Sequence, residues 1–541
     1  MKQINHSFLL AGVYDLRTIS SRDIASSVVF SRVGAVGPNE AKIVIRYPEI
    51  ENGMIRVLWR QADSTLEQTW NPGPLVTLQS EKDWVGVVRL AGLWPRTNYE
   101  YCLAFENSTI LPYPPHPIPF RTFPDPTLST GSKFKFIASS CILPNFPYLP
   151  FQNRRIKGFD LLSQYIESHE RQVLSTPIEK PMAYSDSNIH IDLINSTPPS
   201  IEFILLLGDF IYADVPQYGG YDLESYRRLY RRVYASPSFR KVYERHPILN
   251  IFDDHEFYND FAGNSSNSTQ VLRTAPSAYS LYNGQANYDP MVENEHYYTF
   301  RYGDVAFFVL DTRLHRTPSG MKEHEKTMLG EQQLASLREW LQQVNSTATF
   351  KFIVSSVPFT SLWTVNGEDT WRGYIKERNE ILAIISTIPN IYIISGDRHE
   401  FAAIEYMDSK VVEFSTSPLS MFYIPILRSL KKQSKRLGET PVLYTQNEEG
   451  TVLSDVNLPQ ERVLKYLPLG NFKWTTFEVD TTDHQMPTLK VETVINGKAE
   501  WRHSIFGEAV DIKPSKVVSS NIAKGLKDAL GKIGLSPEKW F

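Results

Sequence analysis

The stretch Ile201–Asp214, IEFILLLGDFIYAD, contains a nearly continuous apolar run that stops at Gly208-Asp209. A short apolar run that ends at a turn signal is typical of a strand buried on both faces. Ligands of open α/β sheets bind beyond the carboxyl ends of such strands, so we expect Asp209 at a functional edge, where Tyr212 can also reach. The alternative is that Asp209 merely caps the turn or helix that follows.

Other short apolar segments repeat this pattern and predict further strands. They are Lys133–Ser140, Ile248–Phe252, Val305–Leu310, Phe350–Ser355 and Ile391–Ser395. Helical patterns at Asp222–Arg245 and Gly330–Val344 lie between several of them, and this alternation indicates an α/β layered sheet. We interpret the tyrosine stripe Tyr226, Tyr230 and Tyr234 on the first helix as packing. The segment 152–200 has a loop-like composition, typical of an insertion near the mouth of a cleft.

The first quarter of the chain predicts strands and no helix. The strands are expected at Ala41–Tyr47, Ile55–Arg60, Trp84–Leu90 and Asn98–Phe105. The stretch LWPRTNYEYCLAF resembles the corner of a fibronectin-type or immunoglobulin-type β-sandwich, with Cys102 as a buried small residue. We interpret Arg121–Pro126 as a linker. The chain then consists of a sandwich domain, 1–126, a catalytic domain, 127–510, and a tail, 511–541.

Composition excludes several classes of protein. A chain of 541 residues is too long for one ordinary core, and a net charge of −4 leaves no footprint for nucleic acid. The two cysteines, Cys102 and Cys141, cannot form a disulfide framework. The absence of a signal peptide or a membrane-length apolar run favours a cytoplasmic location. Six glycosylation sequons leave a secretory location open, at Asn5, Asn107, Asn195, Asn264, Asn267 and Asn345.

The last quarter of the chain is less regular. Phe472–Val479 and Leu489–Asn496 predict a closing β-hairpin, and the basic stretch Arg428–Arg436 predicts a solvated loop or helix face. The tail 513–541 is amphipathic. We expect it to dock against the body of the protein; the alternative is peripheral contact with a membrane.

Four predicted strands end in potential metal ligands. The endings are Ser139-Ser140-Cys141, Gly208-Asp209 with Tyr212, Asp253-Asp254-His255-Glu256 and Ser395-Gly396-Asp397-Arg398-His399. On a single sheet these ends would converge, and carboxylates gathered there would repel one another without cations between them. Thiolate, phenolate and imidazole suit iron, whereas carboxylates suit calcium, magnesium or manganese. The alternative for each ending alone is a buried Cys, a capping Asp or a salt-bridged His.

The stretches FIASSC, LLLGDFIYAD, NIFDDHEFYND, FFVLDTRLHR and IISGDRHEF, in this order, carry a resemblance that covers about half of the chain, from Phe136 to Leu419. They resemble the PhoD-like alkaline phosphatase/phosphodiesterase family of calcineurin-like metallophosphatases. The resemblance implies a four-layer α/β/β/α catalytic domain that hydrolyses phosphate esters, with a metal-bound hydroxide as nucleophile. A shared carboxylate would hold two ions about 3.5–4 Å apart, as in two-metal phosphoryl-transfer sites.

The resemblance also implies roles for individual residues. The ligands of a ferric ion would be Cys141, Asp209, Tyr212 and His399. Asp209 would bridge to a second ion, Ca²⁺ or else Mg²⁺, Mn²⁺ or Zn²⁺, held by Asp254 and Asp397. His255 would be the general acid. The candidate phosphate contacts are Arg398 and Arg313, and Arg313 is equally well explained as a structural salt bridge.

One position departs from the wider superfamily, which places a His where this chain has Ser355-Ser356. PhoD-like members also lack that His, which favours a hard second ion over zinc.

The resemblance leads to a first hypothesis, a phosphomonoesterase of the alkaline phosphatase type, with phosphodiesterase activity left open. One alternative is a phosphodiesterase for glycerophosphodiesters, nucleotides or lipid head groups, and others are a non-catalytic metal-binding interaction protein or purely structural metals. The natural substrate and the oligomeric state stay open.

Overall fold

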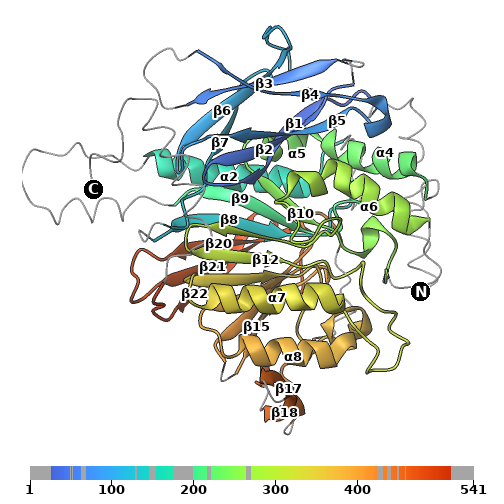
Figure 1. Cartoon of the computed structure of the whole chain (residues 1–541), viewed down its shortest axis with the longest axis vertical. Coiled ribbons are helices and arrows are strands. Elements are labelled where there is room, and N and C mark those ends of the chain that lie inside the picture. Colours follow the sequence, from blue (N-terminus) through green and yellow to red (C-terminus); the bar gives the residue numbers. More distant parts are fainter. Residues whose placement is uncertain are drawn as a thin grey trace, which may run out of the picture.

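The computed structural model describes residues 26–48, 50, 53–62, 69–127, 131–144, 154–175, 199–215, 221–263, 270–407, 409–422, 430–434, 440–447, 450–456 and 459–512. Two large sheets form the centre of the molecule (Figure 1). The six-stranded sheet has the order β10 (Ile248–Ile251), β9 (Ile201–Leu207), β8 (Lys133–Ser139), β20 (Lys473–Asp480), β21 (Thr488–Ile495) and β22 (Lys498–Phe506). The seven-stranded sheet has the order β11 (Tyr298–Tyr302), β12 (Val305–Val309), β13 (Phe350–Val354), β14 (Ile391–Ser395), β16 (Val411–Thr416), β15 (Phe401–Tyr406) and β19 (Glu461–Leu467).

Aromatic side chains pack the two sheets face to face. The ring of Phe136 on β8 lies 5.3 Å, between centroids, from the ring of Phe307 on β12 and also 5.3 Å from that of Phe352 on β13. The next residue on β12, Phe308, points the other way and contacts Trp340 on α7 (Gly330–Asn345), with centroids 5.5 Å apart. The central strands β9, β12, β13 and β14 are buried at every residue, which explains why their sequences are continuous apolar runs.

Helices cover the two outer faces (Figure 1). The seven-stranded sheet carries α7 and α8 (Ile375–Ile385), and the six-stranded sheet carries α2 (Lys157–Ser175), α4 (Leu223–Tyr234), α5 (Pro237–Tyr243) and α6 (Val271–Tyr282). Tyr165 on α2 packs edge-on against Trp474 on β20 at 5.5 Å. Tyr279 on α6 donates a hydrogen bond to the carbonyl of Asn250 on β10 at 2.9 Å. The expected four-layer α/β/β/α arrangement is confirmed.

An all-β unit lies at the amino-terminal end, as expected. One sheet has the order β1 (Phe30–Val36), β2 (Glu40–Arg46) and β5 (Val85–Ala91), and the other β4 (Asn71–Thr77), β3 (Met54–Gln61), β6 (Asn98–Phe105) and β7 (Ile118–Arg121). The hydroxyl of Tyr99 accepts a hydrogen bond from the Trp94 N–H at 2.9 Å and closes the corner between the sheets. Cys102 is buried beside Leu58 and Ala104, as a small apolar residue.

The remaining elements are short. A two-stranded sheet joins β17 (Thr440–Asn447) to β18 (Gly450–Val456). Single 3₁₀ turns occur at Ser80–Lys82, Asp254–Glu256, Gly284–Ala286, Gly367–Asp369 and Trp371–Tyr374. Across the described ranges, no helix has both the length and the apolar character needed to cross a membrane.

Two sequence-based expectations were wrong. The helix expected over Asp222–Arg245 is two helices, because Ser236 caps a new helix by accepting the Phe239 N–H and Pro237 occupies its first turn. The loop expected over 152–200 contains α2. The ring of Phe159 on α2 packs against that of Phe239 on α5, with centroids 4.4 Å apart. Residues 152–153 and 176–198 of that segment lie outside the described residues.

Other expectations on the last two-thirds of the chain had mixed outcomes. The tyrosine stripe of α4 packs as expected, since all three rings are buried. The hairpin β20–β21 forms, but β20 inserts beside β8 in the middle of the six-stranded sheet, so the hairpin does not close the fold at an edge. The tail 513–541 lies outside the described residues. Of the basic stretch, residues 430–434 are described, and Lys431 and Lys432 are exposed.

A buried charge network ties the β-sandwich to the helices. The carboxylate of Asp83 lies 2.8 Å from the guanidinium of Arg46 on β2 and 3.0 Å from that of Arg231 on α4. The three side chains are at most 4% exposed. Burial opposes ionisation of Asp83, but the hydrogen bond and charge of Arg46 prevail and lower its pKa below 3.8.

Replacing Asp83 with Asn should destabilise the protein strongly. Asn also tolerates the left-handed backbone of this position (φ 51°), so the change removes the charge without straining the backbone. The buried guanidinium of Arg46 then loses its carboxylate partner, whereas Arg231 keeps its contact with Glu224. Breaking such a network lowers the free energy of unfolding by about 3–5 kcal/mol. The loss is measured by urea unfolding, as a lower midpoint concentration. Because the folded pKa is depressed, this stability is present above about pH 4 and is lost as the pH falls below it. A drop that persists unchanged at pH 3 would contradict the charge argument.

Candidate metal centre

The candidate ligands of the first ion follow the carboxyl ends of three strands. Cys141 follows β8, Asp209 follows β9, and His399 lies between β14 and β15. Each adopts a left-handed backbone conformation, with φ of 61°, 53° and 58°. Such conformations are unfavourable for residues with a Cβ and are concentrated at functional sites. The strand ends therefore turn sharply at the residues whose side chains meet.

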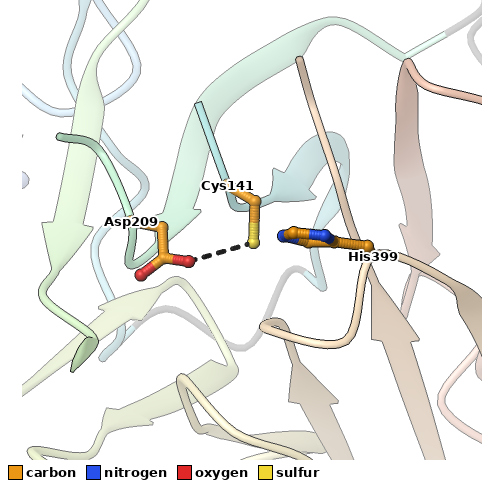
Figure 2. Close-up of side chains that lie close together, drawn as sticks. All are labelled: Cys141, Asp209 and His399. Atoms are coloured by element: carbon orange, nitrogen blue, oxygen red, sulfur yellow. Dashed lines mark hydrogen bonds between the residues drawn. The ribbon is translucent and has the colours of Figure 1, made fainter. Parts of the chain in front are cut away.

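These side chains converge on one point (Figure 2). The thiol of Cys141 lies 3.4 Å from Oδ2 of Asp209, and the hydroxyl of Tyr212 lies 3.1 Å from the same oxygen. The Tyr212 hydroxyl also lies 3.3 Å from Nε2 of His399. One sulfur, one phenol, one carboxylate and one imidazole thus surround a single position, which is a donor set that suits iron.

A second group consists of carboxylates. Asp253, Asp254 and Asp397 each offer an oxygen within 4.8 Å of the others, and Asp254 also groups with Asp209 and His255. One oxygen of each of the three, Oδ2 of Asp253, Oδ1 of Asp254 and Oδ2 of Asp397, is buried without a hydrogen-bond partner in the described part of the chain. Unsatisfied buried carboxylate oxygens are costly, and a hard cation would satisfy them.

Proton affinities of the first group also fit a bound cation. Burial, followed by the charges of Asp209 and Asp397, raises the pKa of the Cys141 thiol well above 9. Burial, and then repulsion from Asp254 and Asp253 against the opposing charge of His255, raises the pKa of Asp209. Burial and the charge of His255 lower the pKa of His399 to about 3, so its imidazole is neutral, as a metal ligand must be. Cations would reverse the first two shifts, and the residues present fit metal ions.

His255 lies beside this group, in the 3₁₀ turn that follows β10. Its Nδ1 lies 2.7 Å from Oδ1 of Asp214, and its ring lies 4.3 Å from the ring of Tyr212. Burial opposes the charged imidazolium, but Asp254, Asp209 and the hydrogen bond with Asp214 prevail and raise the pKa of His255 well above 6.5. The Asp214 contact orients the ring and leaves Nε2 as the nitrogen that can face a substrate.

The two candidate arginines have different surroundings. The Arg398 guanidinium donates to the Val365 carbonyl at 2.7 Å and stacks over Trp363, and its side chain is 14% exposed. The Arg313 side chain is fully buried, with Nε 2.5 Å from Asp253 and its two terminal nitrogens 2.7 and 2.9 Å from Asp369. Arg313 is therefore a structural salt bridge, which was one of its two expected roles, and we do not retain it as a phosphate contact.

Glu256 fixes the loops that carry the ligands. Its carboxylate accepts the backbone N–H groups of Asp209, Phe210 and Asp253 at 3.0, 2.7 and 2.8 Å. Gly208 makes this approach possible, because a Cβ there would lie 2.4 Å from Cβ of Asp253. Glu256 thus holds the ends of β9 and β10 together.

Replacing Glu256 with Gln should weaken the metal centre. The amide keeps the shape but has one acceptor oxygen, so at least one buried N–H loses its partner. We expect the apparent metal affinity to fall about 10- to 100-fold. The affinity is measured from the dependence of activity on free metal concentration. The control is Glu377→Gln, which changes a buried carboxylate on α8 that also accepts backbone N–H groups, from Met328 and Leu329. An equal loss in both variants would contradict a local role.

Several residues at the centre were given no role from the sequence. Asp253 and Glu256 were visible in the Asp-Asp-His-Glu ending, and Asp214 closes the opening stretch, but nothing local marked their partners. Asp369 lies in a short turn far from any strand, and it carries no pattern that could have identified it. Ser356, at the position of the expected departure, donates a hydrogen bond to Asp253 at 2.7 Å.

Comparisons with known proteins agree with this architecture. A family model described as PhoD-like phosphatase matches residues 188–463. Among solved structures, the structure of PhoD is 15% identical, with 95% of this chain and 98% of that chain covered and a TM-score of 0.55. A purple acid phosphatase, PPD1 from yellow lupin (Lupinus luteus) seeds, is 13% identical, with 91% and 77% covered and a TM-score of 0.55. No curated protein sequence matches the chain.

Proposed function

The chain belongs to the PhoD-like phosphatase family, and from this premise we propose that it hydrolyses small-molecule phosphate monoesters at an iron- and calcium-containing centre. Membership makes the protein a metal-dependent phosphoric ester hydrolase. The observation that carries the finer proposal is the position of Asp209, which belongs both to the Cys141–Asp209–His399 group and to the Asp209–Asp254–His255 group. A carboxylate shared between a softer and a harder donor set can bridge two unlike ions.

The proposed ligands divide along the same line. Cys141, Asp209, Tyr212 and His399 would hold Fe³⁺, and Asp209, Asp254 and Asp397 would hold Ca²⁺, or else Mg²⁺, Mn²⁺ or Zn²⁺. When bound, such ions polarise the phosphoryl oxygens and lower the pKa of water. We assign these residues to a catalytic domain over 127–510, preceded by a sandwich domain over 1–126 and followed by a tail over 511–541.

The protein's own residues would perform the remaining steps. His255, oriented by Asp214, would donate a proton from Nε2 to the departing alkoxide oxygen. Arg398, whose Nε is buried without a partner among the described residues, would neutralise charge on the equatorial phosphoryl oxygens. No covalent bond to the protein is needed in this sequence of steps.

A second candidate activity is phosphodiester hydrolysis, for example of glycerophosphodiesters or lipid head groups. The supporting observation is a cavity of about 690 Å³ that adjoins the centre and is lined by Tyr258, Asp260, Arg316, Asp369 and Tyr374, among others. Asp260 connects the two, since its N–H donates to Asp254 at 2.7 Å. Such a cavity has room for the second ester group of a diester.

The test combines metal analysis with paired substrates. The purified protein should contain iron and show a visible charge-transfer band from thiolate and phenolate ligation. It should cleave 4-nitrophenyl phosphate faster than bis(4-nitrophenyl) phosphate. The reverse preference would favour the diesterase. A colourless protein that contains zinc alone would contradict the ferric assignment, and cleavage of neither ester would contradict the activity.

A further inference from the structure

A separate group of potential metal ligands consists of Glu295, Asp311 and His315. Each offers one ligand atom, and these atoms all lie within 4.8 Å of one another. The other groups of this kind in the described chain are linked to one another through Asp209 and Asp254, and none contains any of these three residues. This second group, which we call the 295–315 cluster, is therefore distinct from the metal centre.

The backbone brings the three residues together from two segments. Glu295 precedes β11, whereas Asp311 and His315 lie in the connection between β12 and α7. Oδ1 of Asp311 accepts the N–H groups of Arg313 and Leu314 at 2.9 and 3.0 Å, which curls the connection and returns His315 toward Glu295. Gly330, with φ of 71°, leaves room for the imidazole, since a Cβ there would lie 3.2 Å from Cβ of His315.

The second oxygen of Asp311 is an independent indication of a ligand. Asp311 is 0% exposed, and its Oδ2 has no hydrogen-bond partner among the described residues. A carboxylate oxygen that is buried in this way is destabilising unless a cation or a water satisfies it. Burial also raises the pKa of Asp311, despite the nearby His296, and a bound cation would counter this shift.

We propose that Glu295, Asp311 and His315 bind one divalent cation of the zinc type. One imidazole and two carboxylates form a donor set that zinc accepts, and three protein ligands leave a position for water. The side chains of Glu295 and His315 are 17% and 37% exposed, so an ion can enter from solvent. Nε2 of His315 lies 2.7 Å from Oε2 of Glu295. Zinc bonds of about 2.0–2.2 Å at tetrahedral angles require about 3.4 Å between ligand atoms. The two side chains would therefore have to move apart slightly to admit the ion, which their partial exposure allows.

The bound ion would stabilise a turn next to the metal centre. It would join the connection 311–315 to the segment before β11, in place of the partly exposed contact between His315 and Glu295. The same turn carries Arg313, whose buried guanidinium pairs with Asp253. The proposed ion would therefore help to hold Arg313 in place, the residue that neutralises one of the carboxylates of the centre.

The experiment measures zinc binding to the full chain by equilibrium dialysis with elemental analysis. It uses the Asp209→Asn background, so that binding at the metal centre is weakened, after removal of metals with a chelator. This protein should bind about one Zn²⁺ per chain, and addition of His315→Gln or Glu295→Gln should abolish that binding. The matched control is His324→Gln, which removes a 70%-exposed imidazole from the same connection and should leave zinc binding unchanged.

Each outcome bears on the proposal. Equal zinc binding with and without His315→Gln would overturn it, and so would an Asp209→Asn protein that binds no zinc. A folding defect is distinguished by thermal unfolding in chelator, where the His315→Gln and parent proteins should have the same midpoint. Zinc should raise the midpoint of the parent alone, because an ion that binds the folded state stabilises it.

Discussion

Replacing Asp209 with Asn should abolish turnover of 4-nitrophenyl phosphate and release metal from the protein. Asp209 is 1% exposed, its carboxylate lies within reach of Cys141 and Tyr212, and it is the residue common to both ligand groups at the centre. An amide keeps the shape but cannot supply a shared anionic ligand. Loss of about 4 kcal/mol or more of transition-state stabilisation corresponds to a fall of about 10³-fold or more in kcat/KM.

The control for this prediction is Asp222→Asn. Asp222 caps α4 by accepting the Ser225 N–H at 2.9 Å, and Asn is an equally good cap, so this change should leave both activity and stability unaltered. Elemental analysis of both variants separates loss of metal from loss of chemistry. If Asp209→Asn retained its metals and most of its activity, the bridging role would be wrong.

Replacing His255 with Asn should slow the release of poor leaving groups much more than that of good ones. A general acid contributes about 10²–10⁴-fold, and its contribution is needed when the departing group is an alkoxide. 4-Nitrophenolate is a weak base that leaves without a proton. We therefore expect kcat for a simple alkyl phosphate to fall by about 10²-fold or more and kcat for 4-nitrophenyl phosphate to fall far less.

Metal content provides the second readout for this variant. His255 offers a ligand atom within 4.8 Å of those of Asp209 and Asp254, so a role as a metal ligand is the competing explanation. A general acid predicts unchanged metal content together with leaving-group dependence. Reduced metal content together with an equal loss for both esters would assign His255 to the metal centre instead. Asp214→Asn, which replaces the charged partner of Nδ1 with a neutral amide, should reproduce the leaving-group dependence in weaker form.

The strands of this protein were predictable because their signal is local. Strand β9 was expected at its observed bounds, and β8, β10, β12 and β13 each ended within one residue of their expected positions. A strand buried on both faces must be apolar at every position, so the apolar run alone identifies it. The break between α4 and α5 was missed because a buried tyrosine stripe continues in Tyr243 beyond Pro237 and conceals the change of helix.

The ligand types were also legible in the sequence, since each lies in the sharp turn beyond a buried strand. Cys141, Asp209 and His399 occupy left-handed positions beyond strand ends, where the chain turns and side chains face the edge of a sheet. Their convergence, however, was expected on a single sheet. In the structure, the strands that precede the candidate ligands come from both sheets: β8, β9 and β10 from the six-stranded sheet and β14 from the seven-stranded sheet.

Only the packing of the two sheets decided which side chains meet. Periodicity identifies strands but does not specify which strands pair, because pairing depends on contacts between residues far apart in the chain. The same holds for buried charges: Arg313 meets Asp369 across 56 residues and is thereby removed from the list of phosphate contacts. The local sequence therefore predicted which residue types could bind metal or phosphate. Whether each residue is a ligand, a salt bridge or a proton donor depends on tertiary contacts, because these determine its burial and the charges near it.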